Sequence, residues 1–215
     1  MKITVLGTGM VGNAIATKVV QLGHQVMMGS RTSGNEKATA WADQNGANAS
    51  QGNFAEAAKH GVVIFNCTSG AGAMEALNAA GEQNLSGKVL IDISNPLDFS
   101  KGMPPSLFVC NTDSLGEQIQ KAFPDTRVVK TLNTVNCNVM VNPSLVPGEH
   151  DMLLSGNDPE AKATVTDILK NWFGWKNVID LGDITGARSQ EMWVLTWVRM
   201  WGLFGNPNFN IHVVK

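Results

Sequence analysis

The sequence predicts an α/β fold: a doubly wound, mostly parallel sheet, followed by a small C-terminal α/β extension that ends in a long helix. Short apolar runs rich in Val and Ile alternate with helix-forming segments over the first 135 residues. The first of these runs leads directly into a Gly-x-Gly-x-x-Gly motif. After turn residues at 142–148, the tail repeats the alternation and finishes in a helical stretch.

The glycine motif lies between an apolar strand expected at 2–6 and a helix expected at 13–22, as in Rossmann-like domains. Gly7 allows a tight turn, Gly9 leaves room for a pyrophosphate, and Gly12 lets the helix pack closely on the strand. The free N–H groups at the helix start would then face the phosphates. An ordinary glycine-rich turn is the alternative. The motif gives six residues of a predicted dinucleotide site: Gly7, Thr8, Gly9, Met10, Val11 and Gly12.

The end of the second strand, expected at 24–29, indicates which dinucleotide binds. A site for NAD(H) usually has an Asp or Glu there, which binds the ribose 2′-hydroxyl. Here Ser30 and Arg31 follow the strand, and a guanidinium can pair with a 2′-phosphate and stack on adenine. We therefore predict NADP(H). Alternatively, or at the same time, Ser33 or Asn35 caps the next helix. The segment gives four site residues: Ser30, Arg31, Asn35 and Lys37.

Later strands and helices complete the expected sheet. Strands are expected at 47–49, 61–66, 89–93 and 127–132, and helices at 37–45, 53–60, 74–80 and 114–123. Asn53 and Glu56 have the spacing of a capping box. Ligands of doubly wound sheets bind outside the carboxyl ends of the strands, so we expect the loops after these strands to converge. Each polar residue there could instead serve a turn. The predicted contacts to the nicotinamide half are Cys67, Thr68, Ser69, Ser94, Asn95, Pro96 and Asn133.

The tail is expected to form a second unit. We divide the chain into an NADP-binding domain at 1–140 and an extension at 141–215 that holds an acceptor site, a dimer contact or both. The segment at 136–148 is expected to be irregular. Strands are expected at 150–156 and 177–181, and helices at 158–173 and 187–204. Trp193, Trp197 and Trp201 share one stripe of the last helix, which favours a core or dimer contact over a cofactor-stacking surface.

Composition excludes several other classes. The net charge is −2 and the basic residues are scattered, which argues against nucleic acid or an anionic membrane surface as partner. A core strand at residue 2 leaves no room for a signal peptide, and no apolar run is long enough for a membrane span. The three cysteines are too widely spaced for a disulfide framework or a metal cluster, so we expect a cytoplasmic protein without metal. The lack of Tyr excludes the Tyr-Lys chemistry of short-chain dehydrogenases.

Several segments resemble the F420-dependent NADP oxidoreductases (NADPH:F420 reductases) and, also, the cytoplasmic domain of the six-transmembrane metalloreductases. The resemblance covers about residues 1–135 and implies hydride transfer between NADP(H) and the deazaflavin F420, with the two rings stacked. It implies 2′-phosphate contacts from Thr8, Ser30 and Arg31, and a carboxamide contact from Asn133. The segments are Gly-Thr-Gly-Met-Val-Gly, Leu-Gly-His, Gly-Ser-Arg, Asp-Ile-Ser-Asn-Pro and Lys-Thr-Leu-Asn-Thr.

One departure from the family leaves the second substrate open. The loop at 67–69 is more polar than its counterpart in the family. Direct hydride transfer needs no covalent nucleophile, so we name no catalytic residue. The predicted function is an NADP(H)-dependent oxidoreductase with a deazaflavin or flavin-like acceptor, acting as a homodimer in which one subunit covers the other's site. The alternatives are a reductase of a small carbonyl or imine, favoured by a titratable group buried in the crevice, and a non-catalytic NADPH-binding sensor, favoured by an enclosed nicotinamide.

Overall fold

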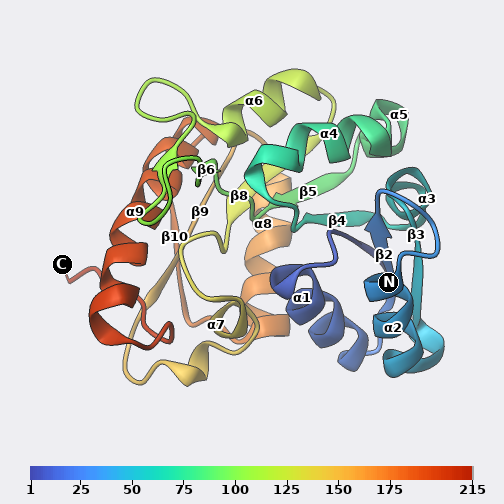
Figure 1. The fold of residues 1–215 in the computed structure, drawn as a ribbon, viewed down its shortest axis with the longest axis horizontal. Coiled ribbons are helices and arrows are strands. Elements are labelled where there is room, and N and C mark those ends of the chain that lie inside the picture. The colour runs from blue at the N-terminus through green and yellow to red at the C-terminus, as the bar shows by residue number, and fades with distance from the viewer. Residues whose placement is uncertain (215) are drawn as a thin grey trace.

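Eight strands join in one sheet in the computed structural model, which describes residues 1–214 (Figure 1). Their order is β10-β9-β8-β5-β4-β1-β2-β3. The six strands from β8 to β3 are parallel, whereas β9 is antiparallel to β8, and β10 is parallel to β9. The predicted fold class is therefore confirmed. The strands are β1 (Lys2–Leu6), β2 (Gln25–Ser30), β3 (Ala49–Asn53), β4 (Val63–Asn66), β5 (Val89–Asp92), β8 (Arg127–Thr131), β9 (Asp151–Gly156) and β10 (Asn177–Asp180).

Helices cover both faces of this sheet. In Figure 1, α4, α5 and α6 lie above it, and α1, α2 and α7 lie below it. The buried residues divide in the same way: α1, α2, α7 and α8 share one apolar cluster, and α3 to α6 share the other. The helices are α1 (Met10–Gln21), α2 (Glu36–Asn45), α3 (Phe54–His60), α4 (Gly70–Ala80), α5 (Glu82–Leu85), α6 (Leu115–Ala122), α7 (Cys137–Val141), α8 (Pro159–Asp167) and α9 (Ala187–Phe204).

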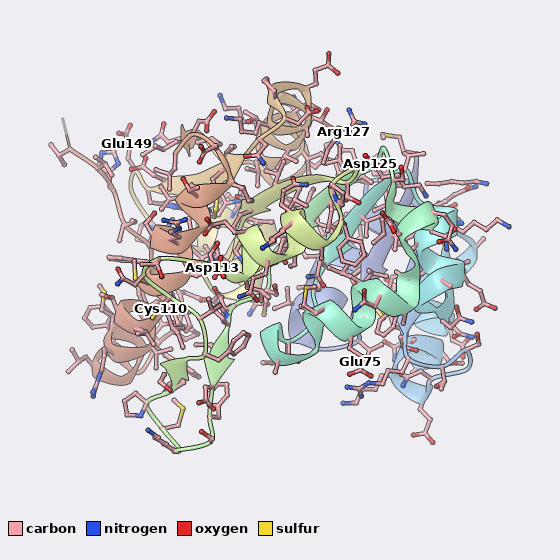
Figure 2. All side chains as sticks on the ribbon, turned by 90° about the horizontal axis from the view of Figure 1, so that it is seen from above. Glu75, Cys110, Asp113, Asp125, Arg127 and Glu149 are labelled. Carbon is pink, nitrogen blue, oxygen red and sulfur yellow. The ribbon has the colours of Figure 1, made fainter. Side chains whose placement is uncertain are left out.

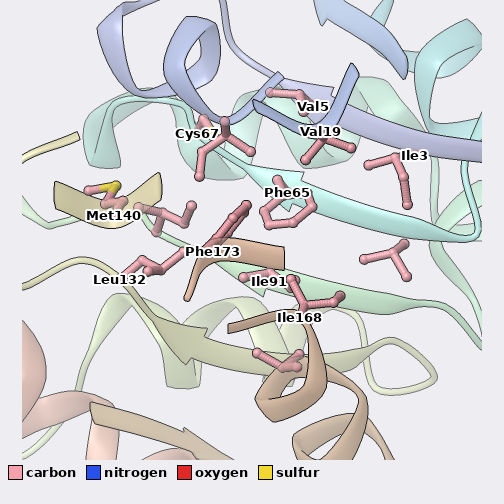
Figure 3. Packing of buried hydrophobic residues seen from close by; sticks show 14 of the residues in the cluster. Ile3, Val5, Val19, Phe65, Cys67, Ile91, Leu132, Met140, Ile168 and Phe173 are labelled. Carbon is pink, nitrogen blue, oxygen red and sulfur yellow. The ribbon is translucent and has the colours of Figure 1, made fainter. Parts of the chain in front are cut away.

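The central strands are apolar throughout because both of their faces are buried. Along β4, Val63 and Phe65 belong to the first cluster, and Ile64 belongs to the second. This is the two-residue alternation of a strand with a core on each side. Figure 3 shows Phe65 within the first cluster, between Val19 of α1 and Phe173 of the helical segment after α8. The Phe65 and Phe173 rings lie 6.3 Å apart, centre to centre.

Two helices begin earlier than the sequence predicted. Helix α1 begins at Met10 and α4 at Gly70, so the glycine motif and the loop after β4 contribute the first turns of helices. The predicted capping box of α3 is confirmed, with Asn53 and Glu56 each accepting from the other's backbone N–H. The prediction that residues 136–148 are irregular was wrong in part, because α7 lies within this segment. That helix is capped by Asn136, whose side chain accepts from the N–H of Asn138.

The sequence predicted the two strands of the C-terminal part but not the hairpin that follows β5. A short hairpin, β6 (Leu97–Asp98) with β7 (Ser106–Leu107), follows the end of β5. Strands β9 and β10, which come after residue 140, extend the sheet that the first 140 residues begin. The tail after α9 returns to the start of β9, where the N–H of Asp151 donates to the carbonyl oxygen of Ile211. Within residues 1–214, no helix is both long and apolar enough to span a bilayer.

Candidate functional site

The turn after β1 depends on two glycines. Gly7 has φ of 115°, in the region that favours glycine, and its N–H donates to the carbonyl oxygen of Gly29 at 2.9 Å. A Cβ on Gly12 would lie 2.0 Å from the Gly7 carbonyl oxygen, so α1 can pack here only without a side chain. A Cβ on Gly9 would meet no atom within 4 Å, which leaves the backbone at the start of α1 open to a phosphate.

A cavity of about 470 Å³, which we call the Arg31 pocket, opens beside this turn. It runs from the glycine motif to the loop after β2 and has α4 as its other wall. Nine predicted site residues meet here: Gly7, Thr8, Gly9, Ser30, Arg31, Asn35, Cys67, Thr68 and Ser69. Five further residues line it: Thr32, from the predicted loop, and Phe54, Gly72, Glu75 and Ala76, from segments that were not assigned to the site.

The loop after β2 leaves one cationic group free toward the pocket. The Ser30 hydroxyl donates to the carbonyl oxygen of Thr32 at 2.7 Å, and the Ser33 hydroxyl donates to Glu56 at 2.6 Å. Asn35 caps α2, as the alternative interpretation required, and still lines the pocket. The Arg31 side chain is exposed, and no described residue forms a hydrogen bond or ion pair with it. Its guanidinium is therefore available for an anion such as a 2′-phosphate.

The opposite wall is one face of α4. Gly72, Glu75 and Ala76 lie within one turn or so of each other and face the pocket together. Figure 2 shows Glu75 between α4 and the pale blue N-terminal elements. Ser69 is the N-cap of α4 and its side chain makes no capping hydrogen bond, so its hydroxyl is uncommitted, whereas its carbonyl oxygen accepts from the N–H of Gly72 at 2.9 Å. The spacing along α4 is the signal by which these residues could have been found from the sequence.

A second cavity, of about 430 Å³, begins where the Arg31 pocket ends. The two cavities share the loop at 67–69 as a lining, and between them they lie at the ends of β2, β1, β4 and β5. We call this cavity the Phe99 pocket. Of the predicted site residues it adds Val11, Ser94 and Asn95. Its remaining lining residues are Gly70, Ala71, Ile93, Leu97 and Phe99. Phe99 follows strand β6, which no sequence pattern predicted, and it is 56% exposed.

The Phe99 pocket carries no formal charge. Its lining includes no Asp, Glu, His, Lys or Arg among the described residues. Its one titratable group is the thiol of Cys67, which is buried. Burial raises the pKa of that thiol, and the nearby Asp92 raises it further. Cys67 therefore remains a neutral thiol near pH 7, and the pocket offers apolar surface, hydroxyls and amides.

Five predicted site residues line neither pocket. Met10 and Lys37 line a separate hollow between α1, α2 and α7, which also touches Thr8 and Gly9. Gly12 lies under the turn, and Pro96 is buried beside the hairpin. Asn133 is buried, and its side-chain NH₂ donates to Asn95 at 2.8 Å and to the Gln190 carbonyl at 3.1 Å.

The tryptophan stripe of α9 lies away from both pockets. Trp197 packs on Phe209 of the tail, with ring centres 5.4 Å apart, and on Trp201 at 5.5 Å. Trp201 itself is 43% exposed. In the described part of the chain, no group of three or more His, Cys, Asp or Glu side chains is arranged to hold a metal ion.

Comparison with known proteins assigns the family. A family model described as "NADP oxidoreductase coenzyme F420-dependent" matches residues 2–96. A provisionally assigned F420-dependent NADP reductase from Arthrobacter sp. FB24 is 47% identical, with complete coverage of both chains and a TM-score of 0.95. The chain belongs to the F420-dependent NADP oxidoreductase family. It is thus an NADP-dependent oxidoreductase with NADP(H) as its cofactor, as the sequence predicted.

More distant relatives agree with this F420-dependent NADP oxidoreductase family. The F420-dependent NADP reductase of Methanocaldococcus jannaschii is 28% identical over 200 residues, which cover 89% of this chain and 88% of the relative. The metalloreductase STEAP3 of Rattus norvegicus is 28% identical over 201 residues, which cover 93% of this chain. The chain spans only 38% of the length of that rat protein. Both resemblances found in the sequence are therefore confirmed.

Proposed function

We propose that this oxidoreductase transfers a hydride between NADP(H) and the deazaflavin F420 or a flavin-like acceptor in the cytoplasm. The supporting observation is the pair of cavities that share the loop at 67–69, one with a free guanidinium and the other without a charged lining residue. NADPH, when bound, supplies the hydride from its nicotinamide ring. The residues of the chain bind the phosphates, orient the rings and exclude water.

The Arg31 pocket fits the adenosine half of the cofactor. The pyrophosphate would lie at the start of α1, where Gly9 leaves the backbone open and the helix dipole favours an anion. Arg31 would pair with the 2′-phosphate, which NADP(H) has and NAD(H) lacks. The Ser30 hydroxyl donates to the carbonyl oxygen of Thr32 and would turn from it to donate to the 2′-phosphate. Lys37 and Met10 would act only from the neighbouring hollow around α1.

The Phe99 pocket would hold the nicotinamide half. The Thr68 hydroxyl donates to Asn66 at 2.7 Å, so Ser69 carries the uncommitted hydroxyl of this loop. The Asn133 side-chain oxygen is buried without a hydrogen-bond partner in the described structure, and it would accept from the carboxamide. Asn95 would hold Asn133 in place, because its side-chain NH₂ donates to the Asn133 backbone carbonyl at 2.9 Å and its side-chain oxygen accepts from the Asn133 side-chain NH₂ at 2.8 Å. Val11 supplies apolar contact beside the ring.

The lack of a charged group in the Phe99 pocket favours a flavin-like acceptor. A carbonyl or imine that receives a hydride leaves a localised basic atom, which needs a proton donor within reach. A deazaflavin or flavin spreads the added electron pair over its ring system and needs no such donor at the atom that receives the hydride. The Cys67 thiol is neutral, and the buried charged groups Asp92 and Lys130 are bonded to each other and do not line the pocket. Reduction of a small carbonyl or imine is the second candidate.

The first experiment is a titration of the protein with NADPH and with NADH, followed by tryptophan fluorescence. A preference for NADPH of at least about tenfold, or roughly 1.4 kcal/mol, is expected. An acceptor screen then compares F420, flavins and ferric chelates with ketones and cyclic imines. Turnover with the ketones or imines alone would replace the proposal with the second candidate. Tight NADPH binding without turnover on any acceptor would indicate a sensor.

We also propose that the protein is a homodimer, joined through α9 and the hairpin that carries Phe99. Six exposed apolar side chains lie on these elements: Phe99, Met103, Met192, Trp201, Leu203 and Phe204. A cavity between the hairpin and α9 is lined by Met103 and Leu203, among others. A second copy seated there would lie close to the Phe99 pocket. A monomer by light scattering at micromolar concentration would remove this proposal, and Leu203→Glu is expected to dissociate a dimer.

A further inference from the structure

A buried charge cluster lies behind the Ser94 wall of the Phe99 pocket, where β5, β8 and α9 meet. The Lys130 ammonium is fully buried and lies 2.8 Å from a carboxylate oxygen of Asp92 and 2.8 Å from one of Glu191. It also donates to the carbonyl oxygen of Ser94. Burial alone would lower the pKa of Lys130, but the two carboxylates outweigh it and raise that pKa, so the ammonium keeps its proton.

Neutral donors balance the second carboxylate of this cluster. The backbone N–H groups of Leu115 and Gly116, in the first turn of α6, donate to the two oxygens of Glu191 at 2.8 and 2.9 Å. The Asn66 amide donates to Asp92 at 2.8 Å. The cluster therefore has one positive and two negative formal charges, each with hydrogen-bond partners in the described structure.

Stability alone does not account for such a cluster. Removing three charges from water carries a large desolvation cost, and apolar side chains of similar volume often stabilise a core as well or better. A fully satisfied polar network gives something that an apolar core does not: a single defined geometry for every group bound to it. The question is then which groups the cluster fixes.

The cluster holds two walls of these pockets. All polar atoms of Ser94 are engaged: its hydroxyl and N–H donate to Asp92 at 2.7 and 3.3 Å, and its carbonyl accepts from Lys130. Ser94 lines the Phe99 pocket. On the other side, Asn66 accepts from the hydroxyl of Thr68, which lines both pockets. The loops after β4 and β5 are thus joined to each other and, through α9, to the C-terminal part of the chain.

We propose that Lys130 is a positioning residue for hydride transfer, and that with Asp92 and Glu191 it fixes the loops against which the nicotinamide and the acceptor are aligned. The proposal rests on the proposed function, because alignment matters only where a hydride moves between two rings. The phosphates and the adenosine are bound elsewhere, in the Arg31 pocket. Loss of the cluster should therefore lower turnover and leave the affinity for NADPH nearly unchanged.

The test neutralises the whole cluster in one variant, with Lys130→Met, Asp92→Asn and Glu191→Gln together, so that no unpaired charge remains buried. Turnover is expected to fall about 100-fold, because a small misplacement of reacting groups has effects of that size. The Kd for NADPH, measured by tryptophan fluorescence, should stay within about threefold of the wild type. The emission of bound reduced nicotinamide should shift toward that of free NADPH, since the ring loses its rigid surroundings.

A control removes a lysine beside β5, the strand that pairs with the β8 strand of Lys130. Lys88, at the other end of β5, donates to the carbonyl oxygen of Ala58 at 2.7 Å. Lys88→Met should leave turnover and nicotinamide emission unchanged. A folded triple variant with wild-type turnover and emission would overturn the proposal.

Two further outcomes are also decisive. If the triple variant does not fold, Glu191→Gln alone is measured, since it keeps the neutral pair of Lys130 and Asp92. Turnover is expected to fall about tenfold there, and wild-type turnover would contradict the proposal. If the wild type transfers hydride to no acceptor, the proposed function fails, but the emission of bound NADPH still decides whether the cluster positions the ring.

Discussion

The two pockets that meet at the loop 67–69 are built in opposite ways. The Arg31 pocket has an exposed guanidinium, the open start of α1 and a Ser30 hydroxyl that donates within its own loop. The Phe99 pocket has no charged lining residue, and its walls are fixed from behind by a buried cluster. Charge is thus exposed where an anionic ligand must be recognised and buried where geometry must be held. Recognition of the cofactor and alignment of its ring are separable in this chain.

Two glycine substitutions should have the largest effects, one on cofactor binding in the Arg31 pocket and the other on turnover in the Phe99 pocket. Gly12→Ala places a Cβ 2.0 Å from the carbonyl oxygen of Gly7, and Gly70→Ala places one 1.9 Å from the carbonyl oxygen of Asn95. Gly12→Ala is expected to weaken NADPH and 2′,5′-ADP alike, by about 100-fold. Gly70→Ala should leave 2′,5′-ADP bound and lower turnover by about 100-fold. Calorimetric titration with both ligands, beside steady-state kinetics, measures the difference.

Gly9→Ala is the control for the first of these substitutions. Its Cβ would meet no atom of the protein within 4 Å, so the melting temperature should not change. A loss of NADPH affinity in this variant would come from a clash between the new Cβ and the cofactor, as expected for a pyrophosphate lying against the backbone. Equal affinity in Gly9→Ala and wild type would mean that the motif is only a tight turn.

Arg31→Ala should produce the next largest effect. Removing a guanidinium from a phosphate is expected to weaken NADPH roughly 30-fold and to leave NADH unchanged. Arg31→Lys should recover part of the loss, because the charge remains but the paired donors do not. Lys37→Ala, in the neighbouring hollow, should cost no more than about threefold by screened, longer-range attraction. Competition between NADPH and NADH in one titration checks all three, and equal losses for both dinucleotides would make Arg31 structural.

More of the Arg31 pocket than of the Phe99 pocket could be predicted from the sequence, for a physical reason. The glycine motif, the Arg31 loop and the capping box of α3 are local patterns, in which neighbours along the chain determine the geometry. The residues of α4 that line this pocket could also have been predicted, because helical spacing places them on one face. The direction of β9 was not, because an apolar run has the same alternation whether it is parallel or antiparallel.

The Phe99 pocket depends on contacts between distant segments. Lys130 meets Asp92 and Glu191, which belong to β5 and α9, and no local pattern pairs them. A lysine within an apolar strand gives little indication that its ammonium is fully buried. Phe99 lies beyond a two-residue strand, too short for any periodicity to show. The sequence therefore predicted which strand ends converge and could not predict what fixes them.

Phe99→Ala is expected to act on the acceptor alone. The ring is 56% exposed, so its removal should change the melting temperature little. It borders the pocket where the acceptor would stack, and an aromatic contact of this kind typically contributes about 1 kcal/mol, or roughly fivefold. We expect the KM for the acceptor to rise by about that factor while the Kd for NADPH stays constant. A rise in the Kd for NADPH would place Phe99 against the cofactor instead.

Cys67 should have the smallest effect, although it lies where the two pockets meet. In an unfolded chain the thiol would lose its proton above its ordinary pKa of about 8.5. Burial raises the pKa of Cys67 in the folded protein, so this thiol stays protonated as the pH rises from 6 to about 9. Turnover should therefore show no inflection from this group over that range. Iodoacetamide at pH 8 should label the exposed Cys110 first and leave Cys67 unmodified. Rapid labelling of Cys67 that NADPH prevents would show instead that the shared loop opens, and that the two pockets are not held rigidly.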